Sequence, residues 1–350
     1  MNHIASNREV EDISPEAPHG EKKLKLIIQI PCYNEAGTLA IALAELPREL
    51  PGIDKIEWLI IDDGSTDETV EVARANGVDH IVQHHTNVGL ARAFMTGLQA
   101  SLALGADIIV NTDADNQYCA SDIPALVAPI LEGKAQYVIG TRPISEIAHF
   151  SVIKKLLQKL GSFVVRRISG TDVEDAPSGF RALSRDTAMR MNVFNRYTYT
   201  LETIIQAGYK NIPIVCIPVR VNADLRPSRL VKSIPRYIQR SVFTMIRIFV
   251  VYRPFKFFFT IGVIFFLAGF CVGLRFLCHW LTGGGQGMMQ SLILAAILLL
   301  MGTVFGMMAF MADLLSVNRQ LLEDIQYRQR KNCFDPIPSS GNDTQHKDRL

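Results

Sequence analysis

Oxygen-bearing side chains occupy alternate positions in the segment Asp113-Ala114-Asp115-Asn116-Gln117. Residues two apart in an extended chain point to the same side. Asp115 and Gln117 are therefore predicted to face one hard cation, Mg²⁺ or Mn²⁺, whose other ligands would be water and substrate phosphates. Because a D-x-D segment in a loop is common, a solvated turn is the alternative to a metal site.

The elements that would position this segment alternate along the chain from about residue 23 to 222. Apolar, β-branched runs at 26–30, 57–61, 80–82 and 107–111 predict strands, and amphipathic helices follow the first three. Ser65 is expected to cap the second helix, with Glu68 three residues later. Such repeats predict an α/β fold, Rossmann-like, with a mainly parallel sheet and helices on both faces. Ligands bind beyond the carboxyl ends of these strands, where Asp62-Asp63 and Asp113 fall.

Composition excludes several other classes of function. The chain has no GxGxxG and no GxxxxGK[ST] segment, so neither a dinucleotide cofactor nor a P-loop is indicated. Its 36 basic and 34 acidic residues are balanced, which argues against a nucleic-acid partner. Six cysteines form no CxxC pair, as expected for a reducing compartment.

The apolar content is concentrated near the carboxyl end. The 350-residue chain is 48% hydrophobic, and no Asp or Glu occurs from residue 225 to 312. Two membrane spans are predicted, at about 255–281 and 290–315, since about 20 apolar residues cross the hydrocarbon core. Basic residues flank both spans on the same side, so the catalytic domain and the C-terminus are expected on the cytoplasmic face of the inner membrane. A buried hairpin in a soluble core is the alternative, but the sequence offers no helices to cover it.

The remaining segments complete the predicted domain organisation. Residues 1–22 are polar and are expected to be a disordered N-terminus, followed by a catalytic domain over 23–232. Residues 233–254, with Arg236, Arg240 and Arg247 at helical spacing, predict a basic amphipathic helix. This helix would lie in the membrane interface or, alternatively, pack on the soluble body. Residues 317–350 are expected to form a largely disordered cytoplasmic tail.

Six motifs occur in an order that resembles a known family. They are Pro31-Cys32-Tyr33-Asn34-Glu35, Asp62-Asp63-Gly64-Ser65-Thr66-Asp67, Asn87-Val88-Gly89-Leu90, Asp113-Ala114-Asp115-Asn116-Gln117, Gly140-Thr141-Arg142 and Asp175-Ala176-Pro177-Ser178-Gly179-Phe180-Arg181. With them the chain resembles inverting family 2 glycosyltransferases of the GT-A fold, in the branch of dolichol-phosphate mannosyltransferase and bacterial undecaprenyl-phosphate glucosyltransferases. The resemblance covers about residues 26–232 and extends to the hairpin.

The resemblance implies a role for each matching residue. Asp113, Asp115 and Asp175 would be catalytic, with Asp175 either a base or a group that orients the acceptor. Asp62 is favoured over Asp63, which a capping turn would also explain. The nucleotide-sugar site would comprise Pro31, Tyr33, Asn34, Glu35, Asp62, Asp63, Asp113, Ala114 and Arg142.

A second set of residues is implied to bind phosphate or the acceptor: Arg181, Arg226, Ser228 and Arg229. For Arg142 and Arg181 a structural role is the alternative. The family often has Gly-x-Ser-Lys near the end of the domain, where this chain reads Arg226-Pro227-Ser228-Arg229. The charge is kept, while the missing glycine changes the expected loop shape.

The expected function is inverting transfer of one sugar from a nucleotide-diphosphate donor to a polyprenyl phosphate lipid. UDP-glucose is the favoured donor and GDP-mannose the next. A processive polysaccharide synthase is one alternative, but neither Trp58 nor Trp280 follows the Q-x-x-R of such enzymes. A scaffold or a component of a lipid-sugar translocation system is the other, although it would be free to lose the carboxylates. A homo-oligomer, such as a tetramer, is left open.

Overall fold

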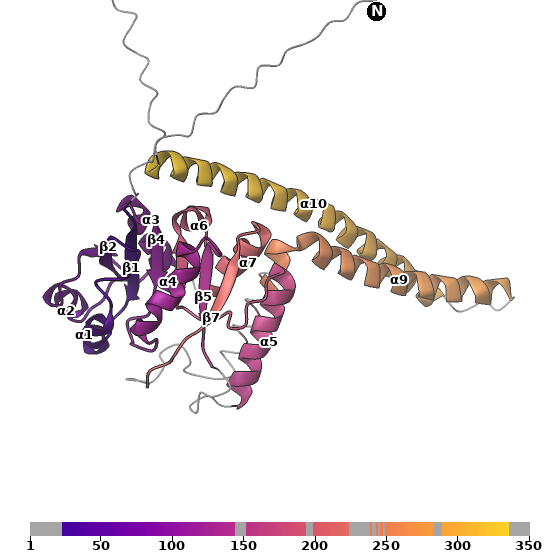
Figure 1. Ribbon diagram of the computed structural model, residues 1–350. Coiled ribbons are helices and arrows are strands. Elements are labelled where there is room, and N and C mark those ends of the chain that lie inside the picture. The colour runs from indigo at the N-terminus through magenta and orange to yellow at the C-terminus, as the bar shows by residue number, and fades with distance from the viewer. Residues whose placement is uncertain are drawn as a thin grey trace, which may run out of the picture.

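A seven-stranded sheet forms the centre of the α/β domain that precedes the two apolar helices (Figure 1). The computed structural model describes residues 23–143, 152–193, 199–223, 249–282 and 289–335, with isolated positions between 239 and 247. The strand order is β3-β2-β1-β4-β6-β5-β7. The strands are β1 (Lys25–Cys32), β2 (Lys55–Asp62), β3 (His80–Gln83), β4 (Ile108–Asn111), β5 (Tyr137–Thr141), β6 (Arg181–Ser184) and β7 (Ile214–Pro218).

The sheet is mainly parallel, as the sequence predicts. β1 pairs in parallel with β2 and β4, and the register sets Cys32 opposite Asp62 and Gln29 opposite Asn111. The carboxyl ends of β1, β2 and β4 therefore meet at one edge. β6 is the exception, because it runs antiparallel to both β4 and β5. This reversal brings the segment that precedes β6 to the same edge as the ends of β4 and β5.

Helices cover both faces of the sheet. On one face α1 (Ala36–Glu45), α2 (Thr69–Ala75) and α4 (Ile123–Leu131) bury Leu39, Ala73 and Leu126 against the strands. The other face carries α3 (Leu90–Ala103), α5 (Val152–Ser169), α6 (Arg185–Arg190) and α7 (Thr200–Tyr209). A short 3-10 turn, η1 (Ala120–Asp122), precedes α4.

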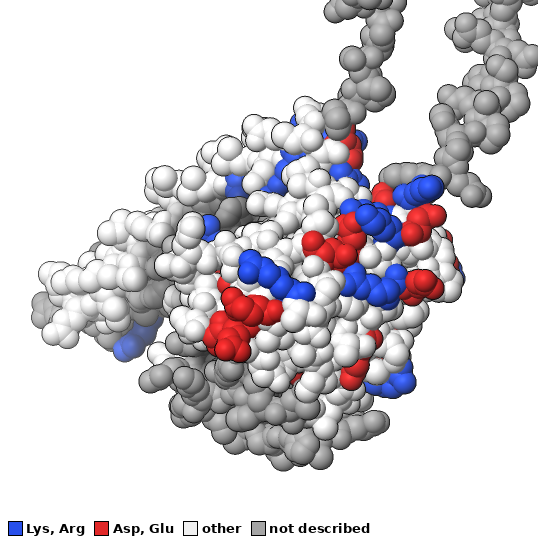
Figure 2. Space-filling view, turned by 90° about the vertical axis from the view of Figure 1, so that its left-hand side faces the viewer, with Lys and Arg blue, Asp and Glu red and all other residues white. Residues whose placement is uncertain are grey.

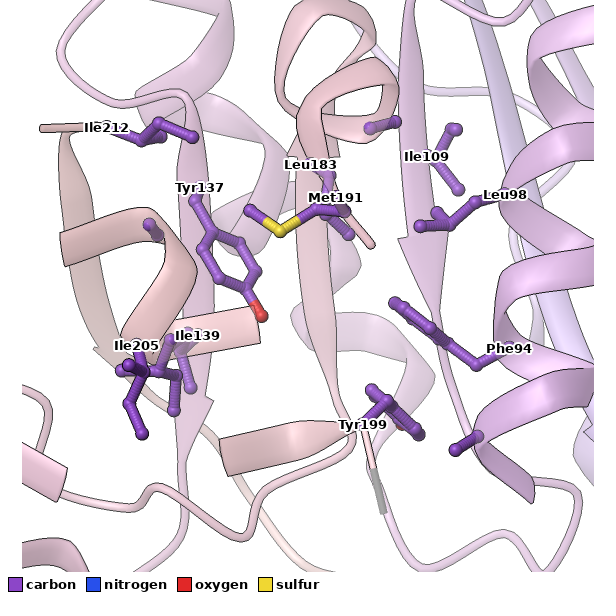
Figure 3. Packing of buried hydrophobic residues seen from close by; sticks show 14 of the residues in the cluster. Phe94, Leu98, Ile109, Tyr137, Ile139, Leu183, Met191, Tyr199, Ile205 and Ile212 are labelled. Carbon is purple, nitrogen blue, oxygen red and sulfur yellow. The ribbon is translucent and has the colours of Figure 1, made fainter. Parts of the chain in front are cut away.

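An aromatic stack lies in the second of these layers. The ring of Phe94, from α3, stacks on Tyr199 with centroids 3.8 Å apart (Figure 3). Both side chains are fully buried. Since Tyr199 immediately precedes α7, the stack ties α7 to α3 beside the end of β4.

Two long helices form a hairpin that projects from the domain (Figure 1). They are α9 (Pro254–Leu281) and α10 (Met289–Phe334), and both are long and apolar enough to cross a membrane. Glycines let the helices approach closely: a Cβ added at Gly302 would lie 2.8 Å from the backbone nitrogen of Phe266. Most of the large apolar side chains along the hairpin are exposed, as lipid-facing residues would be.

The second helix is longer than expected. The predicted span ends at 315, but α10 continues without a break to Phe334. The expectation of a largely disordered tail from 317 is therefore wrong as far as residue 334. The loss of apolar residues marks the end of the span and not of the helix, because the polar part of α10 packs on the catalytic domain. The predicted N-terminal segment 1–22, most of the interfacial helix and residues 336–350 lie outside the described residues.

Candidate active site

Loops from both sides of the β1–β4 centre converge at the carboxyl edge of the sheet. Burial first, and then the carboxylates of Glu35, Asp62 and Asp113, raise the pKa of the Cys32 thiol well above its usual value. These three carboxylates, at or just beyond the ends of β1, β2 and β4, thus act on one point at this edge. The expectation that Asp62 and Asp113 fall at the carboxyl ends of their strands is met, since β2 ends at Asp62 and β4 ends at Asn111.

The predicted metal-binding segment alternates in burial. Asp113, Asp115 and Gln117 are partly exposed, whereas Ala114, Asn116 and Tyr118 are buried. Asn116 adopts the left-handed conformation with φ 56°, and its amide donates to Glu45 Oε1 at 3.0 Å. The Gln117 N–H donates to Asp115 Oδ1 at 3.2 Å. This turn keeps the two carboxylates and the Gln117 side chain on the accessible side of the segment.

The electrostatics of these carboxylates favour a bound cation. Although Asp113 as a whole residue is partly exposed, the burial of its carboxyl group, and next the Asp115 carboxylate, raise its pKa to about 7, while Arg142 and Arg181 oppose the shift. Within the described residues no three His, Cys, Asp or Glu side chains form a metal cluster. The ligands predicted from the sequence are Asp115 and Gln117, and Asp113, whose pKa the Asp115 carboxylate raises, is a third candidate beside them. Such a partial set suits Mg²⁺ or Mn²⁺, which commonly retain water and phosphate ligands.

Asp62 and Asp63 have different partners at the end of β2. Asp63 accepts from the backbone N–H groups of Val88 at 3.0 Å and Gly89 at 2.9 Å, and it lies 2.8 Å from His84 Nδ1. It therefore holds the Asn87-Val88-Gly89 motif against the sheet. Asp62 accepts from the Ser65 N–H at 3.1 Å. Because Asp63 is engaged in holding this loop, the nucleotide contact is better assigned to Asp62, and this remains a prediction.

Asn34 joins the loop after β1 to the loop after β2. Its backbone N–H donates to Ser65 Oγ at 2.9 Å, and its side-chain oxygen accepts from the Thr66 N–H at 2.7 Å. Ser65 is thus used here and does not cap α2, which begins at Thr69; Asp67 Oδ1 accepts the Thr69 N–H at 3.1 Å instead. The expected capping box at Ser65 was wrong because the long-range bond to Asn34 takes its hydroxyl.

The other residues of the first motif differ in exposure. Tyr33 is 41% exposed, so its ring offers a stacking face at the site. Glu35 is buried and accepts from Thr38 Oγ1 at 3.1 Å. Pro31 is a buried residue of β1, paired in register with Ile61, and Ala114 is also buried. Among Pro31, Tyr33 and Glu35 of the first motif and Ala114 of the acidic segment, Tyr33 is the most accessible to a ligand.

Arg142 and Asp175 form a buried ion pair. Arg142 Nε donates to Asp175 Oδ2 at 2.7 Å and Nη2 donates to Oδ1 at 3.0 Å. The Arg142 backbone N–H also donates to Oδ2, at 3.2 Å. Burial opposes the charge of Arg142, but Tyr118, Asp175 and Asp113 together raise its pKa above the usual value. The guanidinium is therefore a permanent positive charge beside the acidic segment.

Arg181 lies in the interior and does not face a ligand. It is fully buried, and its guanidinium donates to the carbonyls of Ser178 at 2.7 Å, Ala176 at 2.9 Å and Thr200 at 2.9 Å. It also donates to Thr203 Oγ1 at 2.7 Å and to the Tyr137 hydroxyl. The predicted phosphate or acceptor contact by Arg181 is wrong, because the residue is fully buried and each guanidinium nitrogen donates within the protein. Its structural alternative is the one observed.

Sequence reasoning missed a network under the acidic segment. Asn111 Nδ2 donates to the Gly179 carbonyl and to the Tyr199 hydroxyl, both at 2.9 Å. The Gly179 N–H donates to the Tyr118 hydroxyl at 2.9 Å. A Cβ at Gly179 would lie 3.0 Å from both Asp113 Oδ2 and the Tyr199 hydroxyl. Gly179 belongs to one of the six motifs, but the sequence alone did not indicate that the absence of a Cβ at this position makes room for Asp113.

Arg226, Ser228 and Arg229 lie outside the described residues. On the face of the domain in Figure 2, basic and acidic groups lie beside each other, and neither sign forms a broad patch among the described residues seen there.

Comparisons with known proteins agree with this geometry. Residues 27–190 match the model of glycosyl transferase family 2. The chain is 29% identical over 221 residues to the UDP-N-acetylglucosamine–dolichyl-phosphate N-acetylglucosaminyltransferase of Methanococcus voltae, covering 57% of this chain and 86% of the relative. It is also 29% identical over 217 residues to the undecaprenyl-phosphate mannosyltransferase of Micrococcus luteus, covering 60% and 81%.

Solved structures share the fold. A glucosyl-3-phosphoglycerate synthase from Mycobacterium tuberculosis, bound to phosphoglyceric acid, superposes with a TM-score of 0.51 at 22% identity. The match covers 63% of this chain and 80% of that one. At this identity the similarity is one of fold.

Proposed function

We propose that this chain, which carries a glycosyl transferase family 2 domain, transfers a single sugar from a nucleotide-diphosphate donor to a polyprenyl phosphate in a membrane, with inversion at the anomeric carbon. One juxtaposition carries the proposal. The Asp113–Asp115 carboxylates and the charged Arg142 stand at the carboxyl edge of a GT-A sheet, and the same chain continues into a hairpin of two apolar helices. The relatives named for dolichyl and undecaprenyl phosphate support this choice of acceptor.

The residues at the edge suit a nucleoside diphosphate sugar. Tyr33 offers an exposed ring to the base, and Asp62 is our candidate for accepting from a base N–H. As the bond between the sugar and the diphosphate breaks, negative charge develops on the leaving group. Mg²⁺ or Mn²⁺ held by Asp113, Asp115 and Gln117 would supply positive charge to those phosphates. Arg142 lies near Asp113 and provides a fixed charge for the same purpose.

The acceptor needs little help to become a nucleophile. A phosphate monoester has a second pKa of about 6, so it is largely dianionic at neutral pH. Asp175 is bonded through both oxygens to Arg142. We therefore assign Asp175 to positioning Arg142 rather than to removing a proton from the acceptor.

The hairpin would bring the site to the lipid. Arg253, immediately before α9, donates through Nη2 to the Ile168 carbonyl near the end of α5, at 2.7 Å. α5 in turn leads into the loop that carries Asp175. Leu160 and Phe163 on α5 are 49% and 56% exposed, and Arg166 and Arg167 follow. These features support our proposal that the site lies next to the bilayer, on the face that the flanking basic residues predict to be cytoplasmic.

A donor screen tests the proposal. Purified protein in vesicles with undecaprenyl phosphate would be incubated with radiolabelled UDP-glucose, GDP-mannose or UDP-N-acetylglucosamine. We propose UDP-glucose first and GDP-mannose second. A labelled product that extracts into chloroform and is cleaved by mild acid is expected with one donor. Label in a polymer, or no product with any nucleotide sugar, would contradict the proposal.

A further inference from the structure

The polar end of α10 packs against the catalytic domain. Beyond the apolar stretch this helix runs over α6 on the side of the domain away from α1 and α2 (Figure 1). We call residues 319–335 the brace. A helix rises about 1.5 Å per residue, so α10 is a continuous rod of roughly 70 Å from the hairpin loop to the end of the brace.

The first set of brace contacts is made to α6 by Tyr327. Its hydroxyl donates to Asp186 Oδ1 at 2.6 Å. Asp186 Oδ2 accepts from Arg190 Nε at 2.7 Å, and the Arg190 guanidinium lies 4.5 Å from the centre of the Tyr327 ring. The aromatic residue is thus held by an anion at its hydroxyl and a cation at its face.

The second set caps the end of α6 and secures the end of the brace. Arg330 is buried, and its Nη1 donates to the carbonyls of Met191 at 2.7 Å and Met189 at 3.0 Å. From the other side, Arg185 donates through Nε to Asp335 Oδ1 and through Nη2 to the Phe334 carbonyl, both at 2.8 Å. Both arginines use charge-assisted bonds across the contact, which are stronger than neutral ones.

A third set lies nearest the hairpin. Glu323 Oε2 pairs with Lys210 Nζ at 3.0 Å, and the Arg319 guanidinium lies 4.3 Å from the centre of the Tyr252 ring. Tyr252 precedes α9 by two residues, and its hydroxyl lies 3.3 Å from Glu202 Oε1 on α7. The start of α9, α7 and the brace are therefore joined at one place.

The braced helix is connected to the candidate active site through β6. α6 begins at Arg185, immediately after β6 ends at Ser184, and β6 runs antiparallel across the sheet from the loop of Gly179, which lies against Asp113. We propose that the brace is a positioning element that fixes the height and tilt of the catalytic edge relative to the membrane hairpin, so that the head group of a lipid acceptor meets the donor. This inference rests on the proposed acceptor, and Arg330 and Tyr327 are its positioning residues.

Arg330→Ala is the test, with Arg328→Ala as the matched control. Arg328 lies on the same helix but is largely exposed, and among the described residues its side chain bonds within α10, to Asp324 Oδ2 at 3.1 Å. Each full-length variant would be assayed with undecaprenyl phosphate in vesicles and with a short, water-soluble prenyl phosphate in detergent. Hydrogen exchange of the amides of residues 185–191 would be measured in parallel.

The two acceptors are expected to respond differently. In Arg330→Ala, transfer to the bilayer acceptor should fall by about tenfold, while transfer to the soluble acceptor stays within about twofold, because only the former depends on placement relative to the membrane. Exchange at residues 185–191 should rise, and Arg328→Ala should match the wild type in all three readouts. Equal losses with both acceptors, or no loss with either, would overturn the inference.

Two further outcomes are covered by the same design. If Arg330→Ala does not fold, Tyr327→Phe removes only the hydroxyl that reaches Asp186, and the same split between acceptors is expected in smaller measure. If the wild type transfers to neither acceptor, the proposed function is contradicted. Amide exchange at residues 185–191 then tests whether the brace holds α6, independently of sugar transfer. Unchanged exchange in Arg330→Ala would overturn the inference.

Discussion

Arg142 holds both carboxylate oxygens of Asp175, through Nε at 2.7 Å and Nη2 at 3.0 Å, in a pair that is buried beside the acidic segment. A carboxylate engaged in this way is poorly placed to accept a proton from the acceptor. Its partner is held in one orientation, so the positive charge of Arg142 stays fixed beside the acidic segment and needs no reorganisation as negative charge develops on the leaving group. The pair makes Asp175 a residue that acts through Arg142.

Asp175→Asn therefore separates positioning from general-base catalysis. We expect kcat to fall by roughly 10²-fold, because the asparagine cannot hold the guanidinium through two charged bonds. The shape of the pH profile should not change, since the groups expected to set its acid limb, the acceptor phosphate with a pKa of about 6 and Asp113, are both still present in the variant. Steady-state rates from pH 5 to 9 check this. Loss of the acid limb in Asp175→Asn would identify Asp175 as the base.

Gly179→Ala tests the packing under the acidic segment. The new Cβ would lie 3.0 Å from Asp113 Oδ2 and from the Tyr199 hydroxyl, so Asp113 must move. We expect sugar transfer to fall by at least about tenfold, as small displacements of reacting groups are costly. Gly161→Ala, where the Cβ meets nothing within 4 Å, is the control. Equal rates in the two variants would show that Asp113 does not need this space.

The parallel sheet and the convergence of its loops could be predicted because they follow from local patterns. Alternating apolar strands and helices determine which chain ends meet, so Asp62 and Asp113 could be placed at one edge. Arg181 could not be placed, because a motif gives a residue type and not the five acceptors that surround its guanidinium. Ser65 and the end of α10 were misjudged for the same reason. Their partners, Asn34 and α6, are remote in sequence.

Glu57 gives the fold a dependence on pH that is remote from the active site. Burial opposes its charge, but bonds from Lys25, Lys55 and His80 lower its pKa to about 2. The pKa of Glu57 in the folded state lies below the pKa of an unfolded glutamate, which is about 4.3. This carboxylate therefore stabilises the fold above about pH 4.3, and its contribution is lost as the pH falls toward 2.

Glu57→Gln should accordingly lower the free energy of unfolding at pH 7 by about 3 kcal/mol. The difference from the wild type should shrink as the pH is lowered below about 4. Denaturant unfolding across this range measures it. Glu132→Gln removes an exposed carboxylate paired with Lys134 and should change little. A difference for Glu57→Gln that is independent of pH would contradict the assignment.

The hairpin depends on the small residue at its crossing. Gly302→Val would place side-chain atoms against Phe266, whose backbone nitrogen lies 2.8 Å from the position of a Cβ. We expect a loss of about 1–3 kcal/mol from this overpacking. Gly306→Val on the same helix is the control, because a Cβ there meets nothing within 4 Å. Thermal unfolding in detergent should show a lower midpoint for Gly302→Val alone, and equal midpoints would contradict the packing.

The most direct measurement compares the wild type with Asp115→Asn in sugar transfer to undecaprenyl phosphate, over a titration of Mn²⁺ and Mg²⁺. The wild type is expected to give a chloroform-soluble sugar lipid that depends on the metal and is lost with EDTA. Asp115→Asn should lose at least about 10²-fold in rate at every metal concentration while keeping its unfolding midpoint. Near-normal transfer by Asp115→Asn in saturating metal would contradict the central claim that these carboxylates serve a metal-dependent glycosyl transfer to lipid.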